Sequence, residues 1–227
     1  MIVYTNCLAH VYIDLIIPSI LHQLSLKALH NNRLKGEVLV KKFFSLLLIV
    51  TGSVLIIFAS YQIYVQKADT KKSLVEAEQL LTEKNGDKSK NKDVSYQKNE
   101  AIGILHIPKI DGKLPIIKGT DEEMLAKGVG HYESTALPGE NEQILLSGHR
   151  DTVFRDFGDL EVGDRFTVEM AYGTFEYEMK EAEIVSADDT TVIRPTGEEV
   201  LTLSTCYPFS YIGPAPDRYV IYAYPVK

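Results

Sequence analysis

The sequence predicts a mainly β domain, closed or nearly closed into a barrel, that follows a single transmembrane helix. Residues 43–65 form an uncharged apolar run, and beyond Glu100 the chain changes to short alternating runs separated by turn residues. Many short strands with little helix favour closure, because a closed barrel leaves no exposed strand edge. A length of 227 residues allows one such domain with an anchor, but not two large domains.

The apolar run from Phe43 to Val65 is long enough to cross the hydrocarbon core of a bilayer as a helix. A buried helix of a soluble protein would normally show a polar face, which this run lacks. Lys41 and Lys42 precede it, which weakly favours a cytoplasmic N-terminal segment, residues 1–42. No small-residue cleavage site ends the run, so it is interpreted as an uncleaved signal-anchor.

Residues 1–39 also allow a different start of translation. Their apolar stretch is interrupted by Asp14, Pro18 and His22 and cannot span a membrane. The codons for residues 35–37 can contain a ribosome-binding sequence, and Val40 can be a GTG start codon. On this hypothesis the protein begins at Val40, with two lysines and the apolar run.

Residues 66–100 are predicted to form an extracytoplasmic stalk. They are rich in Lys, Glu, Asn, Ser and Gln, and a short amphipathic stripe is the one helical signal. The stripe consists of Leu74, Val75, Leu80 and Leu81.

A β-rich domain is predicted to begin at Ala101 and to end at Lys227. Strands are expected at residues 101–107, 114–117, 143–148, 199–205 and 218–224, together with a hairpin in which residues 166–170 and 175–179 alternate apolar and polar side chains around a turn at 171–173. Short helices are expected at residues 121–127 and 152–157. No internal repeat is present.

Charge and cysteine content exclude several classes of function. Residues 101–227 contain 11 Lys and Arg against 22 Asp and Glu, a formal net charge of −11, so this domain would repel nucleic acid. Two cysteines, Cys7 and Cys206, are too few for a disulfide framework or for a zinc site of four thiolates. Any chemistry at Cys206 is therefore that of a lone thiol.

Three polar residues are expected to meet at one rim of the barrel. Cys206 ends the strand in LTLSTCYP, and His149 ends the strand in ILLSGHRDT. A thiol beside an imidazole is the smallest activated nucleophile. Arg218 opens the next strand after a short Pro-containing loop, where a cation can stabilise an oxyanion.

These segments resemble the sortase family. LSGHRDT matches the family's histidine motif, TLSTC its cysteine motif and APDRY its arginine, and the resemblance extends from Gly103 to Tyr224. GVGHYESTALPGE and TCYPFSYIGPAPDRYVIY look most like the class D branch. The resemblance implies an eight-stranded sortase-type β-barrel. We expect no cofactor and no metal.

The resemblance also implies roles for particular residues. Cys206 attacks the Thr carbonyl of an LPxT-type sorting signal, His149 protonates the leaving amine, and Arg218 steadies the tetrahedral oxygen. A cell-wall amine, from peptidoglycan or its lipid-linked precursor, then resolves the acyl-enzyme. Substrate binding is expected from Thr205, Ser204 and Ser147, and the loop from Ser186 to Glu198 is expected to contact the Leu-Pro end of the signal.

Other polar residues are weaker candidates. His131 and His106 are more simply interpreted as structural histidines. Asp188 and Asp189 with Glu198 and Glu199 could bind calcium, but their spacing matches no defined calcium loop, and a solvated acidic loop is the simpler interpretation.

Three alternative functions remain open. A cysteine endopeptidase shares the first half-reaction and uses water as the acceptor. A pilin-polymerising sortase is a second alternative, although residues 66–100 lack the aromatic lid typical of that branch. A catalytically inactive wall-binding module is disfavoured, because Cys206, His149 and Arg218 are all present.

Overall fold

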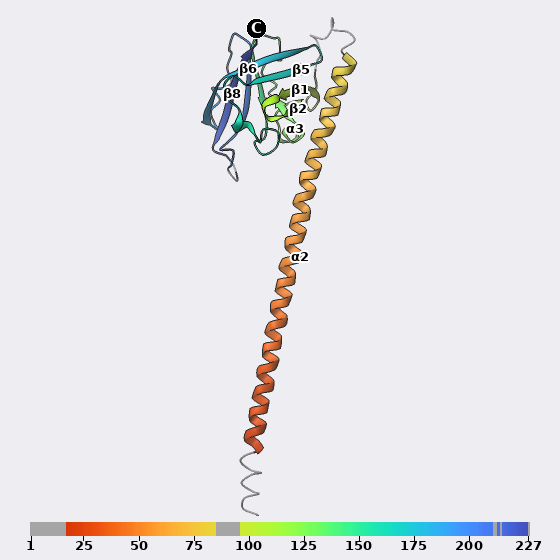
Figure 1. Cartoon of the computed structure of the whole chain (residues 1–227), viewed down its shortest axis with the longest axis vertical. Helices are drawn as coiled ribbons and strands as arrows, with labels where there is room; N and C mark the ends of the chain where they lie inside the picture. The colour runs from red at the N-terminus through yellow and green to blue at the C-terminus, as the bar shows by residue number, and fades with distance from the viewer. Residues whose placement is uncertain (1–16, 85–95, 211–212, 214, 227) are drawn as a thin grey trace, which may run out of the picture. The chain divides into compact units, whose positions relative to one another are not determined.

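The computed structural model describes residues 17–84, 96–210, 213 and 215–226 (Figure 1). Contacts divide the chain into two compact units, residues 1–62 and 63–227. The second unit contains a closed barrel of eight strands in the order β1-β2-β3-β4-β7-β8-β6-β5. The mainly β, eight-stranded barrel expected from the sequence is therefore confirmed.

The elements follow one another along the chain as follows. They are α2 (Ile17–Lys84), β1 (Ala101–Ile107), the 3-10 turn η3 (Pro108–Ile110), β2 (Gly112–Lys118), α3 (Glu122–Lys127), β3 (Val129–His131), β4 (Gln143–Ser147), η4 (Phe157–Asp159), β5 (Arg165–Met170), β6 (Gly173–Ser186), β7 (Val200–Tyr207) and β8 (Asp217–Pro225). Figure 1 shows β5, β6 and β8 side by side in the barrel wall.

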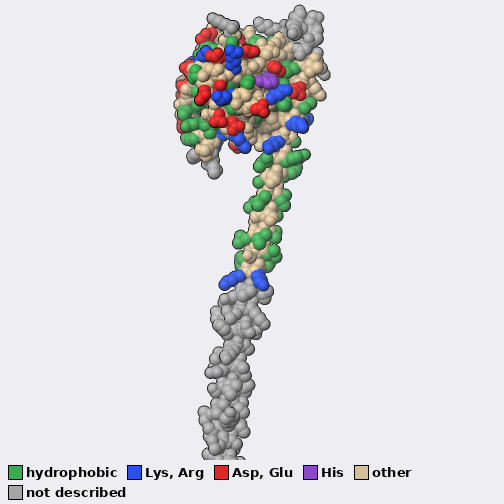
Figure 2. Space-filling view, in the orientation of Figure 1, with side chains coloured by type: hydrophobic (Ala, Val, Ile, Leu, Met, Phe, Trp, Pro, Cys, Tyr) green, Lys and Arg blue, Asp and Glu red, His purple; other side chains and the backbone are tan. Residues whose placement is uncertain are grey.

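Helix α2 contains the apolar run that the sequence predicts to cross a membrane, and this run is a candidate membrane span. Between Lys41 and Thr82 it is long and apolar enough to cross a membrane, and its most apolar stretch has a mean hydropathy of 2.4 with none of it buried. Apolar side chains cover the visible face of this stretch in Figure 2. Residues 1–40 lie outside the part of the chain whose side chains the structure describes. The start of translation at Val40 therefore stays a prediction.

The stalk differs from the sequence-based expectation, because α2 continues as helix to Lys84. Its apolar stripe explains why: Leu74, Ala77 and Leu81 pack against a cluster formed by Ala101, Ile104, Ile117 and Met124 of the barrel unit. Ala77 is fully buried there. Burial of this stripe stabilises a helix that its polar composition alone would not. The boundaries of the stalk and of the catalytic domain stay predictions.

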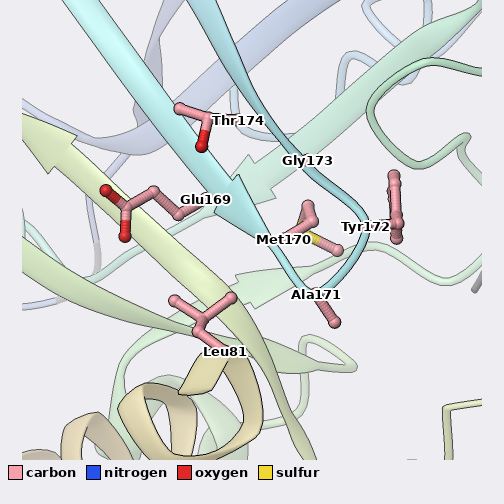
Figure 3. Close-up of a pocket in the computed structure, with 7 residues that line it drawn as sticks. All are labelled: Leu81, Glu169, Met170, Ala171, Tyr172, Gly173 and Thr174. Atoms are coloured by element: carbon pink, nitrogen blue, oxygen red, sulfur yellow. The ribbon is translucent and has the colours of Figure 1, made fainter. Parts of the chain in front are cut away.

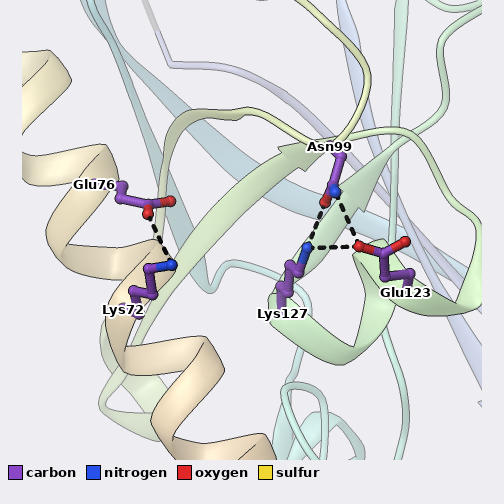
Figure 4. A network of polar contacts seen from close by, with 5 residues as sticks. All are labelled: Lys72, Glu76, Asn99, Glu123 and Lys127. Carbon is purple, nitrogen blue, oxygen red and sulfur yellow. Dashed lines mark hydrogen bonds and ion pairs between the residues drawn. The ribbon is translucent and has the colours of Figure 1, made fainter.

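Polar contacts fix the neighbouring short helix α3 (Figure 4). Lys127 donates to Asn99 Oδ1 at 2.8 Å and to Glu123 Oε1 at 2.9 Å, and Asn99 Nδ2 donates to the same Glu123 oxygen at 2.9 Å. On α2, Lys72 and Glu76 form a looser i,i+4 ion pair at 3.8 Å. These groups are largely exposed, so they orient the helices more than they stabilise the fold.

One apolar cluster fills the barrel interior, and each of the eight strands contributes buried side chains to it. Alternation in β5 buries Phe166, Val168 and Met170, as expected for the β5–β6 hairpin, and Met170 pairs with Gly173 at its turn. The predicted helix at residues 121–127 is confirmed. The helix predicted at 152–157 is wrong: this segment forms turns that lead into η4, where Phe154 and Phe157 stack with ring centroids 3.9 Å apart inside the core.

Strand β3 is the one strand that the residue pattern did not indicate. It has three residues, all of them buried. It pairs in parallel with β2 and antiparallel with β4. Three residues are too few to show a period, so only its two neighbours define it as a strand.

Candidate active site

Three adjacent strands bring the predicted catalytic residues to one rim. Strands β4 and β7 run in parallel with Ser147 opposite Ser204, so both end at the same rim. Strand β8 runs antiparallel to β7 and therefore begins there. His149 follows β4 by two residues, which puts it at the same level as Cys206.

Cys206 and Arg218 are directly opposite one another on β7 and β8. Directly opposed residues of an antiparallel pair point to the same face of the sheet, with Cβ atoms about 4.5–5.5 Å apart. His149 belongs to the strand on the other side of β7. The thiol thus lies between an imidazole and a guanidinium that come from its two neighbouring strands.

The site lies on the outer face of the barrel wall. Leu201 and Leu203 of β7 belong to the interior cluster, so Cys206, three residues beyond Leu203, points the opposite way. Val200 and Val220 on that outer face are buried under Val192 of the β6–β7 loop. The thiol therefore faces the outside of the barrel, on the same face as this loop.

Partial burial suits all three residues to chemistry on a bound substrate. Cys206 is a free thiol, and Cys206, His149 and Arg218 are each half-buried. Half-burial leaves each group accessible to a peptide while removing part of its hydration, which strengthens electrostatic interactions in the site. A nucleophile, an acid-base group and an oxyanion donor in this order can carry out acyl transfer.

Thr205 connects the cysteine strand to the histidine turn. Its side chain is 2% exposed, and its hydroxyl donates to the Gly148 carbonyl at 2.7 Å. Gly148 N in turn donates to Ser204 O at 3.1 Å, which extends the β4–β7 ladder as far as the residue before His149. The hydroxyl of Thr205 is therefore engaged inside the wall, and the expected substrate-binding role of Thr205 stays a prediction.

Ser147 and Ser204 form a pair on the outer face, below Cys206. They are opposite one another in the parallel register of β4 and β7, and both are half-buried. Their substrate-binding role also stays a prediction.

Gly148 is required by packing beside His149. A Cβ on Gly148 would lie 2.6 Å from Phe154 Cδ2 and 2.7 Å from Val153 Cγ2. Phe154 N also donates to the His149 carbonyl at 3.0 Å. The buried Phe154 ring thus closes against the glycine and holds the turn that presents the imidazole.

Backbone carbonyls orient Arg218 and its loop. Arg218 Nη1 donates to Asp217 O at 3.0 Å and to Ala215 O at 3.4 Å. Arg150 supports the same loop, because its guanidinium donates to Pro208 O at 3.1 Å and to Gly213 O at 3.0 Å. Arg150 was not among the residues predicted from the sequence, where its one signal was its position directly after His149.

Aromatic side chains close the barrel interior beneath this rim. Phe209 and Tyr219 meet edge to face at 5.2 Å, and Phe209 and Tyr207 at 5.5 Å. Phe209 also packs against the interior cluster. This packing supports the end of β7 from below, so Cys206 is presented on a rigid wall.

The two other candidate histidines lie away from this trio. His131 is 1% exposed on β3, its Nε2 lies 2.9 Å from Ala136 O, and burial lowers its pKa. His106 is on β1, with its Nε2 3.4 Å from a Glu169 carboxylate oxygen. Both positions fit structural roles.

Two of the four acidic residues considered for calcium, Asp189 and Glu199, accept hydrogen bonds from other groups of the protein. Asp189 Oδ1 accepts from Thr191 N and Oγ1 at 2.8 and 2.6 Å. Glu199 accepts from Tyr177 Oη at 2.7 Å and from Gly139 N at 2.9 Å. Within the described residues, no group of three or more His, Cys, Asp or Glu side chains could hold a metal ion.

A cavity of about 250 Å³ lies elsewhere, between α2 and the β5–β6 hairpin (Figure 3). Leu81 and residues 169–174 line it, and Figure 3 shows Met170 and Leu81 pointing toward it. It contains none of the six predicted site residues. The candidate active site is instead an open surface between β4, β7, β8 and the loop that follows β6.

Comparisons with known proteins agree with this geometry. The family model of the sortase domain matches residues 105–226. The chain is 45% identical to Sortase D of Bacillus subtilis (strain 168) over 192 residues, which cover 80% of this chain and 97% of that protein. A solved Clostridium perfringens Sortase D5 transpeptidase matches with a TM-score of 0.63 and 29% identity, covering 70% of this chain and 99% of that one. The catalytic domain of B. anthracis SrtD matches with a TM-score of 0.52 and 42% identity, covering 61% of this chain and 96% of that one.

Proposed function

The chain belongs to the sortase family and is a cysteine transpeptidase, and from that premise we propose that it cleaves an LPxT-type sorting signal and transfers the surface protein to a cell-wall amine. The observation that carries this proposal is the direct pairing of Cys206 with Arg218 beside the strand that leads to His149. The acceptor is an amine of peptidoglycan or of its lipid-linked precursor.

The chemistry proceeds in two half-reactions. The Cys206 thiol passes its proton to His149 and its sulfur bonds to the Thr carbonyl carbon. The amide C–N bond then breaks, and His149 gives this proton to the leaving amine. The acceptor amine then attacks the thioester, loses a proton to His149 and expels the Cys206 thiolate. Arg218 donates to the oxygen of both tetrahedral intermediates, where fixed donors stabilise developing charge.

The proposed location is the cell membrane, with a single pass and an extracytoplasmic catalytic domain. The apolar part of α2 between Lys41 and Thr82 supports this anchoring. Lys41 and Lys42 favour a cytoplasmic N-terminus. Such an anchor holds the enzyme at the surface where secreted substrates emerge and where cell-wall precursors are assembled.

Product mass tests the proposal. The full-length protein in detergent is incubated with an LPxT peptide, with and without an amine nucleophile, and products are identified by mass spectrometry. We expect an amine-dependent transfer product, and Cys206→Ala should abolish both cleavage and transfer with an unchanged melting temperature. Hydrolysis alone at every amine concentration would identify an endopeptidase, and residual activity of Cys206→Ala within tenfold of wild type would refute the nucleophile.

A further inference from the structure

The loop after β6 runs along the whole outer face of the candidate site. It begins after Ser186, which pairs with Asp217 beside the catalytic rim, and it ends at Val200, which pairs with Gln143 at the opposite rim. A loop of thirteen residues, 187–199, therefore crosses the face on which Cys206 lies. Its conformation determines what a peptide meets there.

Gln143 binds the middle of this loop with both ends of its amide. Its Nε2 donates to Val192 O at 2.8 Å, and its Oε1 accepts from Arg194 N at 3.1 Å. Nε2 also donates to Thr202 Oγ1 at 3.0 Å. A strand bonds to a neighbouring strand through a carbonyl and an N–H that are two residues apart. The buried Gln143 side chain bonds to these same two groups of the loop, and so takes the place of a neighbouring strand.

Glu142 binds the end of the same loop. Its Oε1 accepts from Thr196 N and from Thr196 Oγ1, both at 2.5 Å, and Gly197 N lies 3.3 Å from each carboxylate oxygen. These donors lower the pKa of Glu142 to about 2, so the carboxylate is charged at neutral pH. Gly197 has φ of +68°, a conformation that favours glycine and lets its N–H point at the carboxylate.

The loop backbone is thus held while several of its side chains remain free. Val192 packs onto the outer-face cluster. Ile193, Arg194 and Pro195 are exposed and line a cavity of about 200 Å³ with residues 134–136. A peptide on this face would meet these three side chains on a fixed backbone.

We propose that Glu142 and Gln143 are positioning residues that hold loop 187–199 in its peptide-binding conformation before a substrate arrives. Pre-organisation removes the ordering cost of a flexible loop from the binding step, so the two residues strengthen peptide binding and leave the chemistry at Cys206 unchanged. This inference rests on the proposed function in one respect, that the loop contacts the sorting signal.

The test compares Glu142→Gln with Glu140→Gln in the full-length protein in detergent. Glu140 lies in the same segment before β4 as Glu142. Its carboxylate accepts from Leu137 N at 2.7 Å instead of from residues 187–199. Hydrogen–deuterium exchange of peptides covering residues 191–198 should accelerate in Glu142→Gln and match wild type in Glu140→Gln. KM for an LPxT peptide should rise about tenfold in Glu142→Gln, because the neutral amide oxygen of glutamine is a weaker acceptor than the carboxylate, while kcat stays within twofold.

A change on the loop side provides a second variant that spares the barrel. Thr196→Val removes the hydroxyl from which Glu142 Oε1 accepts and which also lies 2.7 Å from Glu198 O, whereas Thr196→Ser keeps this hydroxyl. We expect Thr196→Val to resemble Glu142→Gln and Thr196→Ser to resemble wild type in both exchange and KM.

Two outcomes overturn the inference. Unchanged exchange in both Glu142→Gln and Thr196→Val means that these contacts do not hold the loop. Faster exchange with KM within twofold of wild type means that loop order does not govern binding. Wild-type protein that cleaves no LPxT peptide refutes the proposed function, whereas the exchange data still decide whether the two residues order the loop.

Discussion

Thr205→Val separates two roles for the residue that precedes the nucleophile. Valine keeps the shape of threonine but cannot donate to the Gly148 carbonyl, which accepts from the Thr205 hydroxyl at 2.7 Å. Both residues are buried. The substitution therefore removes one hydrogen bond without creating a cavity.

The expected cost follows from that geometry. Leaving a buried carbonyl without its donor costs about 1–3 kcal/mol. For a domain of this size each kcal/mol lowers the melting temperature by about 4 °C, so the expected decrease is roughly 4–12 °C. The turn that carries His149 begins at Gly148, so kcat should fall while KM for the peptide changes little.

Thermal melts and steady-state kinetics of the full-length protein in detergent provide the assay. Thr205→Ser is the matched control, because it keeps the hydroxyl and should retain most of the stability and turnover. A Thr205→Val protein that melts within about 1 °C of wild type but has a raised KM would contradict this reasoning. That result would instead support the role expected from the sequence, in which the hydroxyl binds substrate.

Three further substitutions or titrations test other parts of the site. Arg218→Lys should reduce the rate of single-turnover acylation about 10²- to 10³-fold, because an ammonium lacks the planar fork of donors. Acylation at nearly the wild-type rate would mean that Arg218 acts only through its charge and does not bind the oxyanion. Gly148→Ala should cost about 1–3 kcal/mol by overpacking against Phe154 and should slow turnover by displacing His149, and unchanged melting and turnover would disprove that packing constraint. The Glu142 carboxyl should titrate near pH 2 in an NMR experiment, because donors lower its pKa from 4.5. Its contribution to stability is then complete above about pH 4.5 and is lost as the pH falls through about 2, so a midpoint at its ordinary value would contradict the proposed loop contacts.

Local patterns were sufficient for most of the fold. The uncharged run at 43–65 indicated the candidate membrane span in α2. Short apolar runs bounded by turn residues, with period-two alternation in the β5–β6 hairpin, indicated seven of the eight strands. Strand β3 escaped detection because three residues show no period. The helical stripe at residues 74–81 was also visible, but the barrel surface that it packs against was not.

By itself, the sequence determined the chemistry: the order of the histidine, cysteine and arginine motifs, their positions at strand ends, and hence the family. Only the tertiary structure decided how those ends meet, because strand order and register bring β4, β7 and β8 together and direct Cys206 to the outer face. Register also directs the Thr205 hydroxyl into the wall. Glu142 accepts a hydrogen bond from Thr196, which is 54 residues away in the sequence. Such a long-range contact depends on where the closed barrel places two distant loops, so no periodic pattern in the sequence predicts it.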